Sequence, residues 1–470
     1  MVIGRIADGV VQSAEAAAAG VSETFFEPVI RLGVTGLARA GKTVFITSLV
    51  ANLMDRGRMP GLTGAATGAI RAAWLQPQPD DTVPRFAYER HLADLTGEPP
   101  HWPDSTRAVS QLRLSFRVQP AGFVAALSGP RTVHLDIVDY PGEWLLDLGL
   151  MDQSFEEWSA EILDAAERRD EAAPFRAALA EADLGGRMDE PQAEALAAAY
   201  TAYLQAARAA GFSDCTPGRF LMPGELAGSP ALTFAPLPPG PSPRGSLARE
   251  MARRFEAYKR EVARPFFRDH FARIDRQVVL VDLLGALHAG PASVADLADG
   301  LDRTLRAFRP GQASWLSRLL GQRRVERVLL AATKADHLHH LQHPAMAALL
   351  EAMLRQAKDR ADFSGAKTEA LAIAAIRATV EEEREHRGQT LPMVRGVLEN
   401  GKQAALYPGQ VPEEPGRVLG PARSGAETWL DGEFSAMRFR PPGRPSRPGE
   451  GPPHIRLDRA AEFLIGDRLR

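Results

Sequence analysis

The feature that most constrains this chain is the stretch of residues 31–49, where a glycine-rich loop stands between a strand pattern and a helix pattern. The apolar residues 32–34 lead into GLARAGKT at residues 36–43, and apolar residues then recur at helical spacing. Because glycine reaches backbone angles forbidden to other residues, Gly36 and Gly41 allow the loop to turn its N–H groups inward around a phosphate. The pattern G-x-x-x-x-G-K-T in this context predicts a nucleotide phosphate loop.

Each part of this loop has an expected role in binding the nucleotide. The Lys42 ammonium would reach the β- and γ-phosphates, and the Thr43 hydroxyl would ligate Mg²⁺. A helix that begins at about Lys42 adds the positive end of its dipole. The alternative is a chance glycine-rich turn before a helix. The residues expected to contact the nucleotide here are Gly36, Ala38, Arg39, Ala40, Gly41, Lys42, Thr43 and Val44.

A second motif, VHLDIVDYPGE at residues 133–143, predicts a switch that senses the γ-phosphate. Asp139 ends an apolar strand pattern, where it can hold Mg²⁺ through water, and the Gly142 N–H can bond the γ-phosphate. D-x-x-G alone also fits a simple turn. Glu143 could orient or deprotonate the attacking water, but its negative charge is unfavourable beside the γ-phosphate. We therefore favour a structural pairing of Glu143 with an arginine.

A third motif, ATKAD at residues 332–336, follows another apolar run and predicts recognition of the base. The Asp336 carboxylate can accept hydrogen bonds from both N1–H and the 2-amino group of guanine, while the stem of Lys334 lies over the base. Adenine would leave Asp336 unpaired in a desolvated site, so guanine is preferred. The alternative is that Asp336 caps a helix.

The length of 470 residues exceeds one ordinary domain. Apolar runs alternating with helix patterns predict an α/β fold, a P-loop NTPase (GTPase-like) with a mostly parallel sheet flanked by helices and a helical insertion domain. Strands are expected at residues 110–118, 133–138, 276–284, 325–332 and 370–376. The expected units are an N-terminal amphipathic helix (1–30), a first core half with the phosphate loop and switches (31–150), a helical insertion with a Pro/Gly-rich loop (151–268), a second core half with the base motif (269–400), and a Pro-rich tail with a C-terminal helix (401–470).

Composition limits the kinds of partner and the cellular compartment that we expect for this chain. The formal charge of −3 gives no case for binding to nucleic acid. The single cysteine, Cys215, excludes an internal disulfide framework and suits a reducing cytoplasm. We interpret Cys215 as an unreactive thiol. The sequence contains no run of 18 apolar residues, so it predicts no membrane-spanning helix. We therefore expect a cytoplasmic protein, with peripheral association at the inner membrane through the N-terminal helix as the alternative.

The ordered set GLARAGKT, DYPG and TKAD resembles the phosphate-loop, switch II and base-recognition motifs of the GTPase branch of P-loop proteins. With HWPDST, DRQVVLVDLLGALHAG, AIAAIRAT and FLIGDRL, the chain resembles the YcjX family of bacterial P-loop GTPase-like proteins over nearly its whole length. The resemblance implies a GTPase-like core with a large helical insertion. It also implies a link to envelope-stress or phage-shock functions and, in some bacteria, a membrane-protein partner.

Further residues take roles by their position in this resemblance. Thr106 is the best match for the switch I threonine, a second Mg²⁺ ligand. Arg377 and Ala378 stand where small GTPases place Ser-Ala, whose backbone contacts the base. Thr333 replaces the commoner Asn of the base motif, which weakens the preference for guanine. No arginine finger can be selected, and Arg39 and Arg107 are candidates only; the latter lies beside Thr106.

These observations predict a Mg²⁺-dependent protein that binds GTP, hydrolyses it to GDP and phosphate, and acts as a switch. The resemblance implies that this switch serves a stress response. The expected catalytic residues are Lys42, Thr106, Gly142 and Glu143, the expected metal ligands Thr43, Thr106 and Asp139, and the base contacts Thr333, Lys334, Asp336, Arg377 and Ala378. The expected partners are a guanine nucleotide and an unidentified protein. Two alternatives remain: a nucleotide-gated interaction module with negligible turnover, and an ATPase or ATP-using phosphotransferase.

Overall fold

The computed structural model describes residues 27–470 except for short segments. The segments left out are residues 37–39, 105–108, 120–128, 213–214, 270, 307–324, 356–365, 387, 426–428, 435–436 and 445–446. Most of the N-terminal helix expected at residues 1–30 therefore lies outside the described residues. So do four of the residues singled out above, which are Ala38, Arg39, Thr106 and Arg107.

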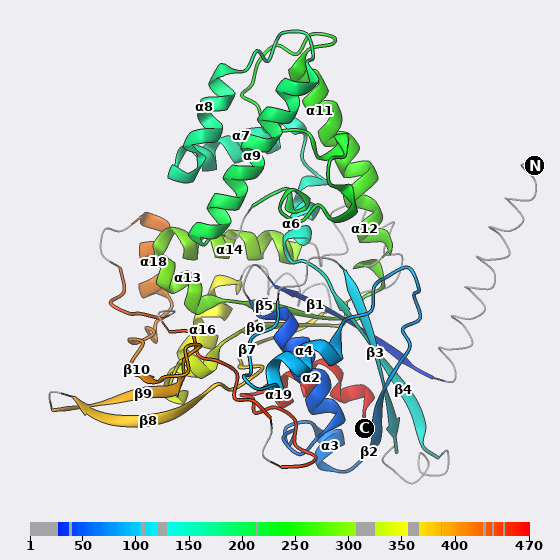
Figure 1. Ribbon diagram of the computed structural model, residues 1–470, viewed down its shortest axis with the longest axis vertical. Helices are drawn as coiled ribbons and strands as arrows, with labels where there is room; N and C mark the ends of the chain where they lie inside the picture. Colours follow the sequence, from blue (N-terminus) through cyan, green and yellow to red (C-terminus); the bar gives the residue numbers. More distant parts are fainter. Residues whose placement is uncertain are drawn as a thin grey trace, which may run out of the picture.

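A mostly parallel sheet forms the centre of the molecule (Figure 1). In the described part of the chain it has seven strands in the order β2-β3-β4-β1-β5-β6-β7. Among these strands, β3 alone runs opposite in direction to the other six. The predicted α/β fold is confirmed, and all five expected strands are present. The strands are β1 (Val29–Gly36), β2 (Ile70–Gln76), β3 (Ser110–Val118), β4 (Arg131–Asp139), β5 (Arg276–Val281), β6 (Arg327–Ala332) and β7 (Lys367–Ala372).

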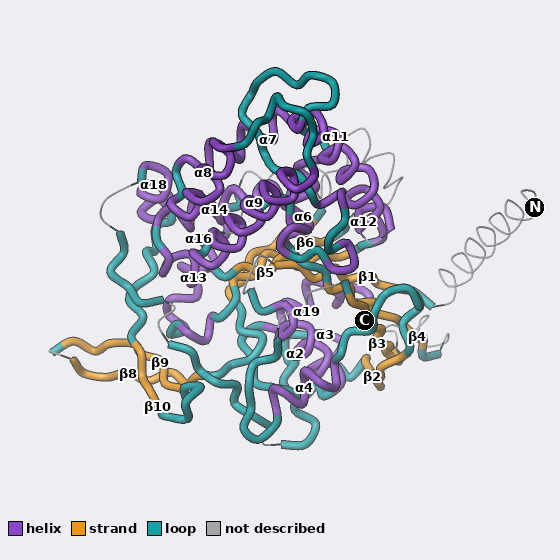
Figure 2. Tube along the Cα trace, turned by 45° about the horizontal axis from the view of Figure 1, so that its top comes forward, coloured by secondary structure: helices purple, strands orange, loops and turns teal. Residues whose placement is uncertain are grey.

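Apolar side chains of the central strands point alternately to two hydrophobic cores, one on each face of the sheet. On β5, Val278 and Leu280 belong to one core, and Val279 and Val281 belong to the other. This is why these strands read as continuous apolar runs. Helices α2 (Lys42–Met54) and α19 (Leu457–Ile465) cover the first face (Figure 2). The second face is covered by α13 (Leu283–Ala289), α14 (Pro291–Arg306) and α16 (His343–Met353).

The expected helical insertion stands over this second face (Figure 1). Its helices are α7 (Phe155–Glu167), α8 (Ala173–Glu181), α9 (Glu190–Ala210), α10 (Gly218–Leu221), α11 (Leu247–Tyr258) and α12 (Arg264–Asp269), and α6 (Glu143–Leu150) directly precedes them. Rings of Trp158, Phe234 and Phe255 pack together inside it, with centroids 4.9–5.8 Å apart. The insertion shares one hydrophobic core with α6. Its packing therefore begins at α6, before the boundary expected at residue 151.

The chain beyond β7 holds strands and a helix that the sequence analysis did not predict, and some of them lie within the expected Pro-rich tail (401–470). A second sheet contains β8 (Thr379–His386), β9 (Gln389–Val397) and β10 (Gln403–Leu406), and α18 (Gly416–Ser424) packs on α14. The boundary expected at residue 400 therefore separates two strands that pair with each other. The sequence did not predict this sheet, because β8, TVEEEREH, exposes most of its side chains and shows no clear apolar alternation.

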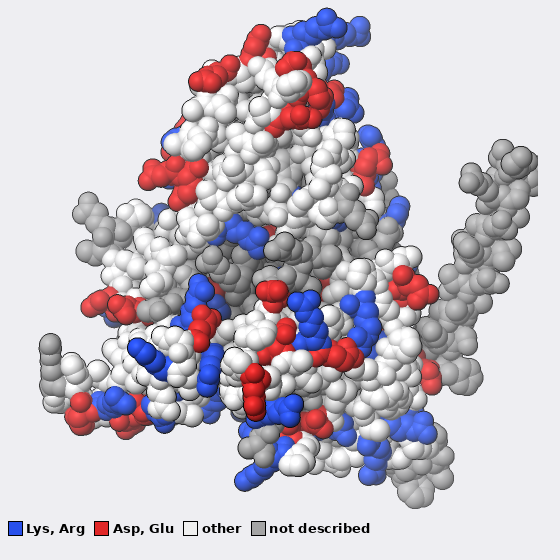
Figure 3. Space-filling model, viewed as in Figure 1, with Lys and Arg blue, Asp and Glu red and all other residues white. Residues whose placement is uncertain are grey.

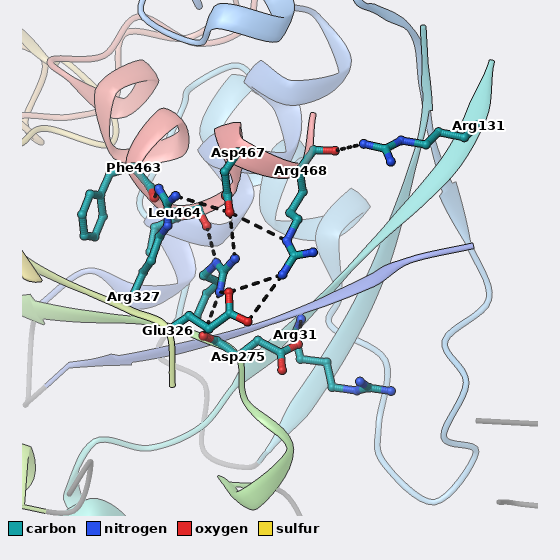
Figure 4. Close-up of polar contacts among 10 residues, drawn as sticks. Arg31, Arg131, Asp275, Glu326, Arg327, Phe463, Leu464, Asp467 and Arg468 are labelled. Carbon is teal, nitrogen blue, oxygen red and sulfur yellow. Dashed lines mark hydrogen bonds and ion pairs between the residues drawn. The ribbon is translucent and has the colours of Figure 1, made fainter. Parts of the chain in front are cut away.

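A buried arginine fastens the C-terminal helix to the sheet (Figure 4). Arg276 begins β5 and is 1% exposed, and its Nε donates to the Leu464 carbonyl at 3.0 Å. Its Nη2 lies 3.1 Å from an Asp467 carboxylate oxygen, and its Nη1 pairs with Glu326. Arg327, the first residue of β6, pairs with Asp467 as well, at 3.3 Å. The cluster thus holds the C-terminal helix against the amino ends of β5 and β6.

The surface carries charges of both signs. On the face shown in Figure 3, Lys and Arg alternate with Asp and Glu in a band across the core, and the middle of the insertion is largely uncharged. Among the described helices, none combines the length and the apolar character that crossing a bilayer requires.

Candidate functional site

The phosphate loop joins the carboxyl end of β1 to the amino end of α2. Gly41 caps α2 in the left-handed region with φ 79°, which favours glycine. A Cβ on Gly36 would lie 2.8 Å from the Leu280 carbonyl oxygen, so the loop can leave the sheet here only because the residue is glycine. Gly41 therefore has the backbone conformation that the motif predicts, whereas Gly36 is the last residue of β1 and needs to be glycine because of its close packing on Leu280.

The switch motif begins at the adjacent strand end. β4 runs parallel to β1, with Asp139 opposite Val34, so Asp139 lies beside the start of the phosphate loop. Asp139 is 1% exposed and Thr43 is 6% exposed. A carboxylate and a hydroxyl are hard oxygen donors, and this donor set fits Mg²⁺. Gly142 is the N-cap of α6, so helix α6 starts directly after the expected γ-phosphate contact.

Glu143 pairs with an arginine of the insertion. Its side chain is 3% exposed, and one carboxylate oxygen lies 2.8 Å from Nη2 of Arg208 in the last turn of α9. The preferred sequence interpretation, pairing with an arginine, is confirmed. The partner was missed because it lies on a distant helix, and its only local signal is a basic residue near a helix end. The backbone of Glu143 is also closely packed, against Gly218 of α10. A Cβ on Gly218 would lie 2.2 Å from the Glu143 carbonyl oxygen.

The base motif is held by contacts to three neighbouring segments. The Thr333 hydroxyl donates to the Val281 carbonyl at 3.2 Å. Lys334 adopts φ 61° and its ammonium pairs with Asp282, the N-cap of α13. Asp282 is a second residue that the sequence analysis missed, although it follows an apolar strand directly. These contacts fix the position of the Lys334 stem.

Asp336 links the base motif to the segment after β7. It is 4% exposed, and its Oδ2 accepts a hydrogen bond from the Ala378 N–H at 2.9 Å. The Thr379 hydroxyl donates to the Asp336 carbonyl. The alternative of a helix cap is wrong, because Asp336 lies inside a short 3₁₀ turn, Ala335–His337, whose N-cap is Lys334.

Arg377 and Ala378 are placed differently from the expected base contacts. The Ala378 N–H is used by Asp336, and Nε of Arg377 donates to the Thr379 carbonyl at 3.0 Å. The preceding residues, 374–376, line the cavity instead. The Ser48 hydroxyl of α2 donates to the Ala375 carbonyl and joins this wall to the phosphate-loop helix.

A cavity of about 730 Å³ brings the phosphate loop and the base motif together. This volume lies within the usual range for small-molecule sites. The predicted residues that line it are Ala40, Gly41, Val44, Thr333, Lys334 and Asp336. Those that do not line it are Gly36, Lys42, Thr43, Asp139, Gly142, Glu143, Arg377 and Ala378. The last turn of α9 and the start of α13 complete the wall on the insertion side.

The tail contributes a wall that sequence analysis did not anticipate. Met437, Arg438 and Phe439 line the cavity together with Trp102, whose indole N–H donates to the Phe439 carbonyl at 2.7 Å. The Phe439 ring lies 5.4 Å from that of His337, next to the base motif. The expectation of an irregular tail was therefore incomplete, since part of it closes the base end of the cavity.

Two buried groups under the site have shifted pKa values. Burial raises the pKa of Asp147, on α6, to about 7, although its carboxylate accepts from the Gly218 N–H at 2.8 Å and from the Tyr258 hydroxyl. Burial raises the pKa of the Cys215 thiol to about 12. A thiol with such a pKa is not a nucleophile at neutral pH, as the sequence analysis expected.

Comparison with known proteins gives matches over almost the whole chain. The model of the YcjX-like family, DUF463, matches residues 30–469. A protein of Escherichia coli (strain K12) named Ras-like GTPase YcjX is 36% identical over 458 residues, which are 94% of this chain and 96% of that protein. A protein of the same name from Shewanella oneidensis is 34% identical over 467 residues, 94% of each chain.

Proposed function

Because the chain belongs to the YcjX-like family, we propose that it is a P-loop protein that binds GTP with Mg²⁺, hydrolyses it to GDP and phosphate, and acts as a switch. The observation that carries this proposal is that one cavity is lined by residues of both the phosphate loop and the base motif. The name Ras-like GTPase of two relatives supports the choice of a guanine nucleotide.

The phosphate end of the site would act by position and charge. The N–H groups of the loop and the Lys42 ammonium would bind the phosphates, and the Gly142 N–H would donate to the γ-phosphate. Thr43 and Asp139 would hold Mg²⁺, whose charge offsets that of the β- and γ-phosphates. Thr106 as a further ligand remains a prediction from the family resemblance.

The base end would discriminate guanine from adenine. The Asp336 carboxylate, already oriented by the Ala378 N–H, would accept from N1–H and the 2-amino group of guanine. The ion pair with Asp282 would keep the Lys334 stem along the cavity wall, beside the base.

The output of the switch would pass through α6. This helix begins directly after Gly142 and shares its hydrophobic core with the insertion. A movement of Gly142 toward the γ-phosphate would therefore move the insertion. A role in a stress response, a membrane-protein partner and a cytoplasmic location are part of the proposal, and the family resemblance supports them.

A competition titration tests the choice of nucleotide. We expect GTP and GDP, but not ATP or ADP, to displace labelled GDP from the wild-type protein in Mg²⁺. Lys42→Ala should lose binding. Asp336→Asn should lose guanine nucleotides and gain xanthine nucleotides, because xanthine has a carbonyl where guanine has the 2-amino group. Since Asn can still accept from Ala378, this variant separates base recognition from a structural role. Equal displacement by ATP would instead assign the protein to the ATP-using alternative.

The second candidate is a nucleotide-gated interaction module with negligible turnover. The observation that favours it is the ion pair of Glu143 with Arg208, which keeps the Glu143 carboxylate from an attacking water. Multiple-turnover phosphate release by the wild type, well above that of Lys42→Ala, would exclude this candidate.

A further inference from the structure

We propose that Arg208 of the helical insertion acts within the same chain on the γ-phosphate of GTP, and that Glu143 holds it while the γ-phosphate is absent. This inference rests on the proposed GTPase function. It assigns a catalytic role to a residue outside every nucleotide motif of the sequence.

The first argument is the position of Arg208. It lines the cavity, and its guanidinium lies 2.8 Å from the carboxylate of Glu143. Glu143 directly follows Gly142, the expected donor to the γ-phosphate. We therefore assign the guanidinium to the phosphate end of the cavity. The other arginine among the described lining residues, Arg438, lies beside Phe439 at the base end.

The second argument is that the backbone carrying Arg208 is anchored, whereas its side chain retains freedom. Helix α9 is capped at its C-terminus by Gly211, whose φ is 104° and whose carbonyl accepts from the Ser293 hydroxyl of α14 at 2.9 Å. The Arg169 guanidinium stacks on the ring of Phe212, 4.2 Å from its centroid. The Arg208 side chain is 29% exposed. Rotation of the Arg208 side chain can therefore move its guanidinium while the end of α9 stays in place.

The third argument is the exchange of partners that GTP would cause. A γ-phosphate carries more negative charge than one carboxylate and matches the planar fork of a guanidinium. Arg208 would leave Glu143 for the γ-phosphate, and Glu143 would become free to orient water. The water oxygen then bonds to the γ-phosphorus as the bond to the β–γ bridging oxygen breaks, and the water proton passes to the released phosphate. Arg208 offsets the charge that develops on these oxygens.

The test compares hydrolysis and binding in matched variants. We expect Arg208→Ala to lower kcat by about 100- to 1,000-fold, the range for loss of one transition-state donor. Its affinity for GDP should change by less than about threefold, because GDP lacks the γ-phosphate. Arg208→Lys, which keeps the charge but not the fork, should recover only part of the rate. Arg176→Ala, an exposed arginine of α8 remote from the cavity, should keep the wild-type rate.

A second measurement does not depend on turnover. Aluminium fluoride with GDP imitates the transferring phosphoryl group, so the wild type should retain GDP more tightly in its presence and Arg208→Ala should not. Glu143→Gln, which releases Arg208, should keep this response. Normal hydrolysis and normal aluminium fluoride capture by Arg208→Ala would overturn the inference and leave the proposed function standing. A wild-type protein that neither binds nor hydrolyses GTP would overturn both. If Arg208→Ala also lost its affinity for GDP, Arg208 would have a structural role, and the inference would be overturned.

Discussion

Replacing Arg276 by methionine should loosen the C-terminal helix selectively. The side chain is 1% exposed, so methionine fills most of its space but supplies no donor. Loss of the hydrogen bond to the buried Leu464 carbonyl should cost about 1–3 kcal/mol. The carboxylates of Glu326 and Asp467 have side chains 49% and 29% exposed and can regain water, so each lost ion pair adds at most about 1 kcal/mol. The expected total is about 3 kcal/mol.

Hydrogen exchange of the α19 amides measures this effect where it occurs. A loss of about 3 kcal/mol in the free energy of local opening speeds exchange by about a hundredfold. The matched control is Arg468→Met in the same cluster. Its side chain is 48% exposed and 3.4 Å from Glu326, so its loss should cost less than about 1 kcal/mol. Equal exchange in the two variants would refute the argument that burial decides the value of these ion pairs.

Three further substitutions test the site and its support. Asp147→Asn should become progressively more stable than the wild type as pH rises from about 4 to about 7. The folded state opposes ionisation of a carboxyl whose pKa burial raises to about 7, whereas the unfolded chain does not. Urea unfolding at several pH values measures the free energy of unfolding of both proteins. A difference between them that does not change with pH would contradict this prediction. Gly36→Ala should weaken GDP binding at least about tenfold in a titration, because its Cβ would lie 2.8 Å from the Leu280 carbonyl. Unchanged affinity would show that the loop tolerates the shift. Gly218→Ala, with a Cβ 2.2 Å from the Glu143 carbonyl, should destabilise the insertion by about 1–3 kcal/mol in thermal unfolding. A wild-type midpoint would indicate that α10 moves away at no cost.

Local features of the fold were predictable from the sequence. β3 and β4 follow from apolar alternation and an apolar run, and the helix after Gly41 follows from glycine placement and helical spacing. The second sheet was not predictable, because strands that lie largely in solvent need no apolar pattern. Its role at the site was equally hidden, since β9 leads to Glu399 on the cavity wall, and Leu398 forms a β-bridge with the tail residue Phe439, which lines the same wall.

The sequence by itself determined the phosphate loop, the strand end that carries Asp139, the turn after β6 that carries Asp336, and the presence of a helical insertion. Each depends on residues close together in the chain, whose backbone preferences and spacing act locally. Only the tertiary structure decided that Arg208 faces Glu143, and that Asp282 holds Lys334. These pairs join distant segments, and they form because the insertion and α13 pack on one face of the sheet at the carboxyl ends of its strands.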